Sequence, residues 1–213
     1  MIISPAMLKI FEECPKKYFY MYVDKISLPQ NKKFFEKGKN IHAMASYFMK
    51  GLDVSKLESA LSSVEKDIWE YLKNTKYFTY EFLNSEYQIS FKLDEYWFGG
   101  RLDALVKNDG DYYILDYKTG SIPKNPESDY QTMIYLLGID KLLNQKYKSL
   151  NFVYLDLKNK DEKLIKFSDD LKNKYEENLK KIAEKCKISQ NFAKKNKDAN
   201  KCRCDYYKFC NLL

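Results

Sequence analysis

Three charged residues in the middle of the chain have the types and spacing of a metal-dependent hydrolytic site. Asp103 and Asp116 each lie late in a predicted strand, and Lys118 follows Asp116 by two residues. Neighbouring carboxylates repel one another, and a divalent cation such as Mg²⁺ or Mn²⁺ relieves that cost by binding their oxygen atoms. A lysine on the same face of the strand can stabilise a pentacovalent phosphate or help to activate water. We therefore expect Asp103 and Asp116 to hold a metal ion beside Lys118, with the backbone carbonyl of Tyr117 completing the metal shell.

An isolated Asp-x-Lys sequence is more often the solvated end of a strand, so the surroundings matter. The apolar pair Ile114-Leu115 leads into Asp116, and Thr119-Gly120 ends that strand. Asn108-Asp109-Gly110 is a strong hairpin signal between the two aspartate-bearing segments. The two strands should therefore be adjacent and antiparallel, which brings Asp103 close to Asp116.

The elements that must position these residues alternate between helical and strand patterns. Ser4-Pro5 is a good start for a first helix. A sheet with helices packed on it, an α/β fold, is the natural result of this order. We predict further helices over 16–23, 34–50, 54–73, 128–143 and 169–193, and strands over 85–93, 96–107, 111–118, 150–157 and 162–167.

The composition excludes several classes of protein. The chain has 213 residues, of which 45% are hydrophobic and 31% charged. No stretch is apolar enough to span a bilayer, and the N-terminal residues do not resemble a secretory signal, so we expect a cytoplasmic protein with no membrane partner. The net charge of +7 comes almost entirely from lysine and permits a polyanionic partner.

The motifs around these residues resemble the PD-(D/E)XK nuclease superfamily. The segments GGRLDAL, ILDYKTG and DYQTMIY occur in the superfamily's order, and they look most like the RecB-type branch, which includes the AddB nuclease domain and CRISPR-associated RecB-like exonucleases. The resemblance implies a restriction-endonuclease-like core with a mixed central sheet flanked by helices. It also implies catalytic roles for Asp103, Asp116, Lys118, Gln131 and Tyr135.

Two further residues are interpreted through the same resemblance. His42, the only histidine, lies in a segment similar to the G-x-x-x-H helix of the family, where the histidine contributes a metal ligand. Without that context, it would be an isolated surface or packing residue. Glu86 resembles a recurrent acidic position, and its role is left open.

Five cysteines, three of them within nine residues of the C-terminal region, favour a metal site over a disulfide framework. The resemblance implies a [4Fe–4S] cluster held by Cys14, Cys202, Cys204 and Cys210. It would join an N-terminal helical segment to the Cys-rich tail, with residues 1–33 and 186–213 forming the iron–sulfur subregion. The sequence departs from the usual C-x-x-C because Cys202 and Cys204 are one residue apart. A tetrahedral Zn²⁺ site and a role for Cys186 in place of Cys202 are alternatives.

Basic and aromatic runs could serve nucleic-acid binding or simple solvation and packing. The lysines are Lys16, Lys17, Lys32, Lys33, Lys194, Lys195, Lys197 and Lys201, and the aromatics are Tyr18, Phe19, Tyr20 and Tyr22.

The sequence as a whole predicts a single nuclease domain over 1–213. It would hydrolyse phosphodiester bonds with Mg²⁺ or Mn²⁺, and by resemblance its substrate is DNA, degraded exonucleolytically from single-stranded ends. One alternative is a non-catalytic DNA-binding module. Another is a partner-dependent component that works only within a helicase–nuclease or CRISPR integrase complex. The sequence has no helicase P-loop, so a motor would have to come from another chain.

Overall fold

One six-stranded mixed sheet forms the centre of the protein. The computed structural model describes residues 1–28, 36–188, 202 and 204–210. The main strand order is β1-β3-β4-β5-β6, and β2 pairs with β3. β1 is parallel to β3 and β4 is parallel to β5, whereas the other pairs are antiparallel. The strands are β1 (Ile2–Ile3), β2 (Glu81–Leu93), β3 (Tyr96–Asn108), β4 (Asp111–Lys118), β5 (Ser149–Asp156) and β6 (Asp161–Lys166).

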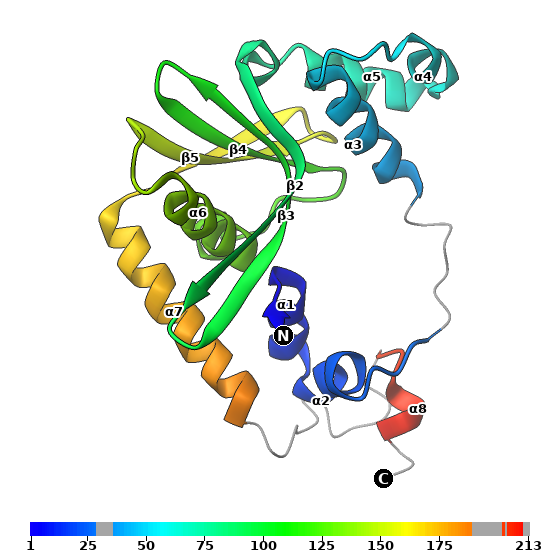
Figure 1. Ribbon diagram of the computed structural model, residues 1–213. Helices are drawn as coiled ribbons and strands as arrows, with labels where there is room; N and C mark the ends of the chain where they lie inside the picture. Colours follow the sequence, from blue (N-terminus) through cyan, green and yellow to red (C-terminus); the bar gives the residue numbers. More distant parts are fainter. Residues whose placement is uncertain (29–35, 189–201, 203, 211–213) are drawn as a thin grey trace.

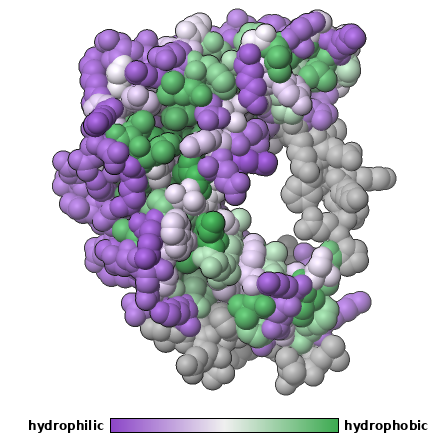
Figure 2. Space-filling view, viewed as in Figure 1, coloured by the Kyte–Doolittle hydropathy of each residue, from purple (hydrophilic) through white to green (hydrophobic). Residues whose placement is uncertain are grey.

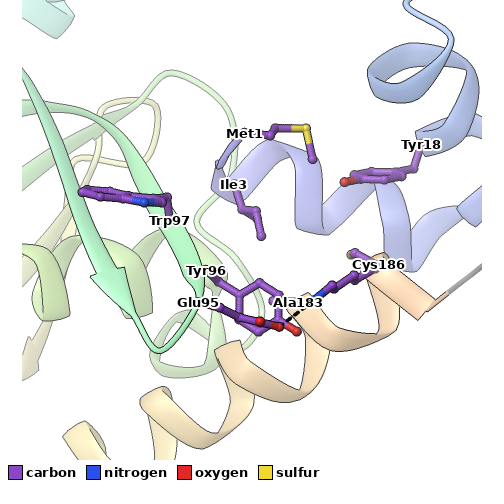
Figure 3. A pocket seen from close by; sticks show the side chains of 9 residues that line it. Met1, Ile3, Tyr18, Glu95, Tyr96, Trp97, Ala183 and Cys186 are labelled. Atoms are coloured by element: carbon purple, nitrogen blue, oxygen red, sulfur yellow. Dashed lines mark hydrogen bonds and ion pairs between the residues drawn. The ribbon is translucent and has the colours of Figure 1, made fainter.

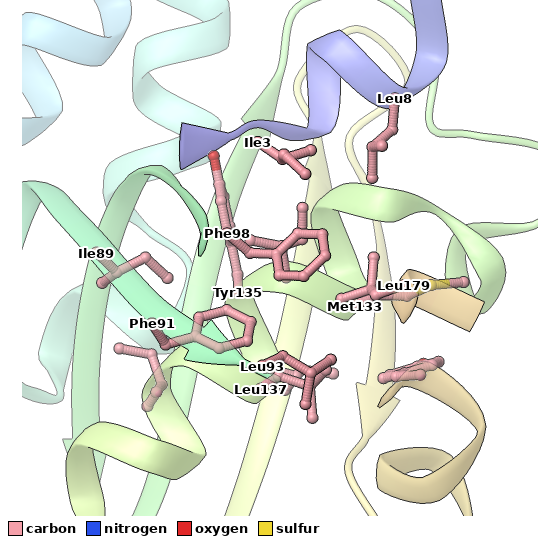
Figure 4. Packing of buried hydrophobic residues seen from close by; sticks show 14 of the residues in the cluster. Ile3, Leu8, Ile89, Phe91, Leu93, Phe98, Met133, Tyr135, Leu137 and Leu179 are labelled. Carbon is pink, nitrogen blue, oxygen red and sulfur yellow. The ribbon is translucent and has the colours of Figure 1, made fainter. Parts of the chain in front are cut away.

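Helices cover both faces of this sheet, as Figure 1 shows. On one face, α1, α6 and α7 share a core with β2, β3 and β5 that includes Leu8, Phe98, Leu137 and Leu179 (Figure 4). On the other face, Ile41 and Met44 of α3 and Leu72 of α5 pack on β3, β4 and β5. These helices are α1 (Pro5–Glu13), α3 (Glu36–Met49), α5 (Ser63–Lys73), α6 (Tyr130–Leu143) and α7 (Asp169–Ile188).

The turns and caps agree with local sequence chemistry. The side chain of Ser4 accepts a hydrogen bond from the Met7 N–H at the start of α1, and Pro5 occupies its first turn. The β3–β4 turn places Asp109 and Gly110 at positive φ, 47° and 84°, as a two-residue hairpin requires. The predicted α/β class and the antiparallel pairing of the two aspartate-bearing strands are thus confirmed.

One predicted helix was wrong, because residues 54–73 form two helices. α4 (Ser55–Ala60) ends at Leu61, whose backbone is extended, and α5 begins after the N-cap Ser62. Ser62 and Glu65 form a reciprocal capping box, which satisfies two backbone donors and starts a new helix. The apolar periodicity continues across this break and conceals it.

Other boundaries also differ from the prediction. β2 begins at Glu81, ahead of the expected start at 85, and β1 was not predicted because two residues show no periodicity. The segment 16–23 divides into α2 (Pro15–Tyr18) and a π-helix (Phe19–Val23). Two 3₁₀ turns, Lys76–Thr79 and Pro126–Ser128, complete the described connections.

The N-terminal segment packs against the C-terminal tail, whose helix α8 is Tyr207–Cys210 (Figure 1). The rings of Tyr20 and Tyr206 stack with centroids 6.0 Å apart. The hydroxyl of Tyr206 donates a hydrogen bond to the carbonyl of Ile26 over 2.8 Å. These contacts confirm that the N-terminal helical segment packs against the C-terminal Cys-rich tail, as the fold prediction states.

In Figure 2, hydrophilic side chains line the left margin of this face, and a group of hydrophobic ones lies beside them toward the upper middle. Among the described helices, none has the length and apolar character that crossing a bilayer would require.

Candidate active site

The two aspartates meet where β3 and β4 separate. The ladder between these strands ends at the pair Ala104–Leu115, so Asp103 and Asp116 stand just beyond it. The backbone N–H of Tyr117 donates to Oδ2 of Asp103 over 2.8 Å, which replaces the next ladder bond with a side-chain bond. The two strands therefore separate at the carboxylate of Asp103.

Helix α6 contacts both β3 and β4 where these strands separate. Gln131 donates through Nε2 to Oδ1 of Asp116 and accepts at Oε1 from Nζ of Lys118, 2.9 Å away. One turn later, the hydroxyl of Tyr135 donates to the backbone carbonyl of Arg101 on β3 over 2.8 Å. The structure thus brings Gln131 and Tyr135 to the predicted site, where Gln131 contacts Asp116 and Lys118 and Tyr135 contacts the Arg101 carbonyl.

The ring of this same tyrosine lies close to the backbone of Gly100 on β3. A Cβ added to Gly100 would lie 2.7 Å from Cε1 of Tyr135. Any larger side chain would push the ring away from the Arg101 carbonyl.

Asp116 is almost completely buried, with 4% of its surface exposed. Its Oδ2 atom forms an ion pair with Nζ of Lys118 at 2.8 Å and has no other polar partner among the described residues. Burial raises the pKa of Asp116 to about 6, against the opposing charge of Lys118. A buried carboxylate with one cationic partner keeps a desolvation cost, which a nearby divalent cation would reduce.

His42, Glu86 and Asp103 form the one group of three potential metal ligands found in the described part of the chain. Their ligand atoms all lie within 4.8 Å of one another. Nδ1 of His42 lies 3.1 Å from Oδ1 of Asp103. Two carboxylates and an imidazole suit a divalent cation such as Mn²⁺ or Mg²⁺. These three side chains fit such an ion, whereas Asp116, also predicted as a ligand, is not among the atoms that lie within 4.8 Å of one another.

Glu86 reaches this group through an unusual backbone conformation. It lies opposite Asp103 in the register of β2 and β3, and its φ is 51°, in the left-handed region. Non-glycine residues held there store strain, which is found often at functional sites. The sequence analysis left the role of Glu86 open, because no local sequence pattern predicts a left-handed backbone conformation at this residue.

The acidic surroundings also affect His42. Burial lowers the pKa of His42, but the hydrogen bond to Asp103 and the charges of Asp103, Asp116 and Glu86 outweigh it, so the pKa is raised. A metal ion at this position would compete with that proton.

Tyr117 supports the site with its backbone and its ring. Its ring is buried and lies edge-on to the ring of His42, with centroids 5.4 Å apart, and its hydroxyl donates to Sδ of Met49. In an extended strand, the N–H and carbonyl of one residue point to the same side. Because the N–H of Tyr117 points to Asp103, its carbonyl also points to the side of the ligand group.

This geometry agrees with comparisons to known proteins. A family model described as the PD-(D/E)XK nuclease superfamily matches residues 2–211. The chain belongs to that superfamily. A crystal structure of an Eubacterium rectale protein, provisionally described as an exonuclease, superposes on the whole chain and 89% of its own length with a TM-score of 0.61 and 12% identity. That likeness supports the restriction-endonuclease-like fold.

Two relatives in the superfamily share sequence with parts of this chain. The CRISPR-associated exonuclease Cas4 of Francisella tularensis subsp. novicida is 26% identical over 125 residues, which is 59% of this chain and 62% of that protein. A subunit of an ATP-dependent helicase/nuclease from Moorella thermoacetica is 32% identical over 59 residues, which is 27% of this chain and 4% of that protein. The chain therefore spans less than two thirds of each relative.

Three of the four predicted cluster cysteines, Cys14, Cys204 and Cys210, lie near Tyr20. Burial raises the pKa of Cys204, and the thiols of Cys202 and Cys14 add to the rise. Burial likewise raises the pKa of Tyr20, followed by contributions from Cys210 and Cys14. No three of these four sulfur atoms, all of which the structure describes, come within 4.8 Å of one another. A [4Fe–4S] cluster and tetrahedral Zn²⁺ both take four cysteine thiolates, so the choice between them stays a prediction.

Cys186 lines a cavity that none of those four cysteines lines. The residue is buried on α7, and the cavity, of about 320 Å³, is also lined by Ile3, Tyr18 and Trp97 (Figure 3). Burial raises the pKa of its thiol to about 12, with a further contribution from Glu12. None of the residues lining this cavity belongs to the ligand group or to the Asp116 network, so the cavity is not part of the candidate active site.

The N-terminal aromatic run is mainly a packing feature. Tyr18 and Tyr20 are buried, and Nζ of Lys16 lies 4.9 Å from the ring centroid of Phe19. Lys17 pairs with Glu13 at 3.5 Å. The remaining predicted basic residues, Lys32, Lys33, Lys194, Lys195, Lys197 and Lys201, lie outside the described residues.

Proposed function

We propose that this protein is a Mg²⁺- or Mn²⁺-dependent deoxyribonuclease. The observation that carries the proposal is the convergence of His42, Glu86 and Asp103 beside the buried Asp116 in a chain of the PD-(D/E)XK superfamily. The bound divalent cation would polarise a phosphodiester and lower the pKa of an attacking water. The ligands of this cation would be His42, Asp103, Asp116 and the Tyr117 carbonyl. Glu86, which the structure places beside His42 and Asp103, would be a further ligand.

The remaining residues would orient the metal ligands and compensate negative charge on the phosphate. Gln131 holds Asp116 and Lys118 in a fixed relation, so the lysine ammonium stays next to the carboxylate. Lys118 would then stabilise the negative charge that develops on the phosphate, or assist deprotonation of water. Tyr135 would fix β3, where it separates from β4, through the Arg101 carbonyl.

We further propose single-stranded DNA ends as the substrate, degraded exonucleolytically. Support comes from the Francisella relative, which is named an exonuclease. The Moorella relative, which belongs to a helicase/nuclease, supports the alternative that a helicase partner is needed for activity. A CRISPR integrase is a second candidate partner, on the same relationship to a CRISPR-associated protein.

We also propose a [4Fe–4S] cluster on Cys14, Cys202, Cys204 and Cys210. Each thiolate of such a cluster binds a different iron, so the sulfur atoms are separated by the width of the cube. The packing of the tail on Tyr20, near Cys14, Cys204 and Cys210, supports a metal centre that joins the two segments. The cluster would join 1–33 to 186–213 within one nuclease domain over 1–213.

The test is a cleavage assay with anaerobically purified protein. End-labelled single- and double-stranded DNA would be incubated with Mn²⁺ and either the wild type or Asp116→Ala. Degradation by the wild type alone would support the nuclease, and the order of label release would give its polarity. An intact iron cluster with no cleavage of any substrate would favour the partner-dependent alternative. Equal cleavage by both proteins would contradict the proposal.

A further inference from the structure

Arg101 differs from the other cations around the site in its side-chain type. The sequence holds 37 lysines and arginines, and only Arg101 and Arg203 are arginine. A guanidinium presents a planar fork that binds phosphate through two parallel hydrogen bonds, which an ammonium cannot do. In a chain that uses lysine nearly everywhere else, an arginine two residues before Asp103 points to a need for that fork.

The backbone of Arg101 is fixed while its side chain remains accessible. The Tyr135 hydroxyl holds its carbonyl at 2.8 Å, and Gly100 leaves room for the tyrosine ring. The Arg101 side chain is 69% exposed. A charged fork on a rigid strand beside an open surface is well placed to receive a ligand.

The guanidinium of Arg101 is paired with Glu86. Nε of Arg101 lies 3.0 Å from Oε2 of Glu86, whose carboxylate also belongs to the ligand group with His42 and Asp103. A cation bound by that group would compete with the guanidinium for the Glu86 oxygens. Because the pair is partly exposed to solvent, its net contribution is small and the exchange costs little.

We propose that Arg101 binds a phosphate of the DNA substrate beside the metal site, and that Glu86 holds its guanidinium until a divalent cation takes the Glu86 carboxylate. This inference rests on the proposed nuclease function. Before the cation binds, Glu86, Asp103 and Asp116 repel a phosphate and Glu86 occupies the fork. Afterwards the carboxylate charge is compensated and the fork is free. DNA binding would therefore depend on the metal through one ion pair.

The first test measures binding rather than cleavage. A fluorescein-labelled single-stranded oligonucleotide would be titrated by anisotropy in Ca²⁺, which takes the same oxygen ligands, and in EDTA. We expect the wild type to bind more tightly in Ca²⁺. Arg101→Ala should lose about tenfold in affinity in Ca²⁺, and its salt slope should fall by about 0.7 for one lost phosphate contact. Arg101→Lys should recover only part of the affinity because it lacks the fork.

The second test separates release of Arg101 from a general charge effect. Glu86→Gln should tighten binding in EDTA, and the same change in an Arg101→Ala background should have a much smaller effect. The exposed pair Lys148–Asp109, 3.2 Å apart at the β3–β4 turn, provides a matched control. Asp109→Asn should leave the difference between Ca²⁺ and EDTA unchanged.

The third test needs no DNA. Calorimetric titration with Mn²⁺ should show tighter binding to Arg101→Ala, because the freed Glu86 no longer has a competing partner, and weaker binding to Glu86→Gln. If the wild type binds DNA and Arg101→Ala binds it with the same affinity and salt slope, this inference alone is overturned. If the wild type binds no oligonucleotide in either condition, the proposed function and this inference fall together.

Discussion

Asp103 accepts a hydrogen bond from the backbone N–H of Tyr117 at the point where their two strands part. Oδ2 of Asp103 thus binds the neighbouring strand, while Oδ1 of the same carboxylate faces His42. Structure and chemistry at this residue can be separated by mutation, because an amide oxygen can still accept the backbone bond but carries no charge.

Asp103→Asn is therefore expected to keep most of the stability and to lose metal-dependent cleavage. Asp103→Ala should lose both, with about 1–3 kcal/mol of destabilisation from the unpaired Tyr117 N–H. Urea unfolding and a cleavage assay with Mn²⁺ would be run on both variants. Equal stability of the two would show that the Tyr117 bond contributes nothing to folding.

The raised pKa of Asp116 predicts an unusual pH dependence of stability. Its carboxyl has a pKa of about 6 in the folded protein because of burial, against 3.8 as its ordinary value. The folded state therefore holds a proton that the unfolded state releases, and metal-free stability should fall as the pH rises from about 4 to 6. The raised pKa of His42 adds a loss of the same sign at higher pH. Thermal unfolding of the wild type against Asp116→Asn, in EDTA, would measure the difference.

Added metal should reverse this trend. Protons and a divalent cation compete for Asp116 and His42, so the stabilisation by Mn²⁺ should grow as the pH rises through about 6. The check is the shift in unfolding temperature with Mn²⁺ at pH 5 and pH 8. A shift of the same size at both values would contradict the assignment of these ligands.

Gln131 should affect cleavage and metal binding because it positions Asp116 and Lys118. Replacing it with alanine frees both Asp116 and Lys118, and loss of such supporting hydrogen bonds commonly costs about 10–100-fold in activity or metal affinity. Steady-state cleavage and Mn²⁺ titration would both be measured. Gln145→Ala, in the loop after α6, is a suitable control and should leave both unchanged.

Tyr154 on β5 offers a test of how Lys118 is held. The Lys118 ammonium lies 5.3 Å from the centroid of this buried ring, and the Tyr154 hydroxyl bonds Oγ1 of Thr132 over 2.8 Å. Tyr154→Phe keeps the ring and should cost about 1 kcal/mol of stability with little change in rate. Tyr154→Leu removes the ring and should slow cleavage about tenfold. Similar rates for both variants would exclude a role for the ring.

The cysteines provide a matched pair of substitutions. Cys14→Ser should lower the iron content and visible absorbance of anaerobically purified protein, because it removes a proposed ligand. Cys186→Ser should leave both unchanged, because that thiol lies in a separate cavity and burial raises its pKa to about 12. Equal iron loss in the two variants would count against the proposed ligand set.

Much of the fold followed from local signals in the sequence. The strands 96–107 and 111–118 and the hairpin between them are marked by apolar runs and the Asn-Asp-Gly turn, so the neighbourhood of Asp103 and Asp116 could be predicted. The break before Ser62 could have been found from its capping box with Glu65, but the continuous apolar periodicity favoured one helix.

The site itself depended more on long-range geometry. The bonds from Gln131 to Asp116 and Lys118 arise only when α6 packs on the sheet. The left-handed conformation of Glu86 is imposed by the tertiary structure and has no sequence signature, since neither Gly nor Asn stands there. Resemblance to a family indicated the positions, and the structure supplies their contacts.

The contact between the first and last described segments has a consequence for synthesis in the cell. The hydroxyl of Tyr20 bonds the carbonyl of Phe209, 189 positions later. At 5–20 residues per second, a ribosome takes roughly 10–40 s to reach the partner of that early segment. During this interval the N-terminal aromatic residues lack the surface that buries them in the finished fold. Nascent chains that stop short of Phe209 would keep that surface exposed and be open to recognition by chaperones or proteases.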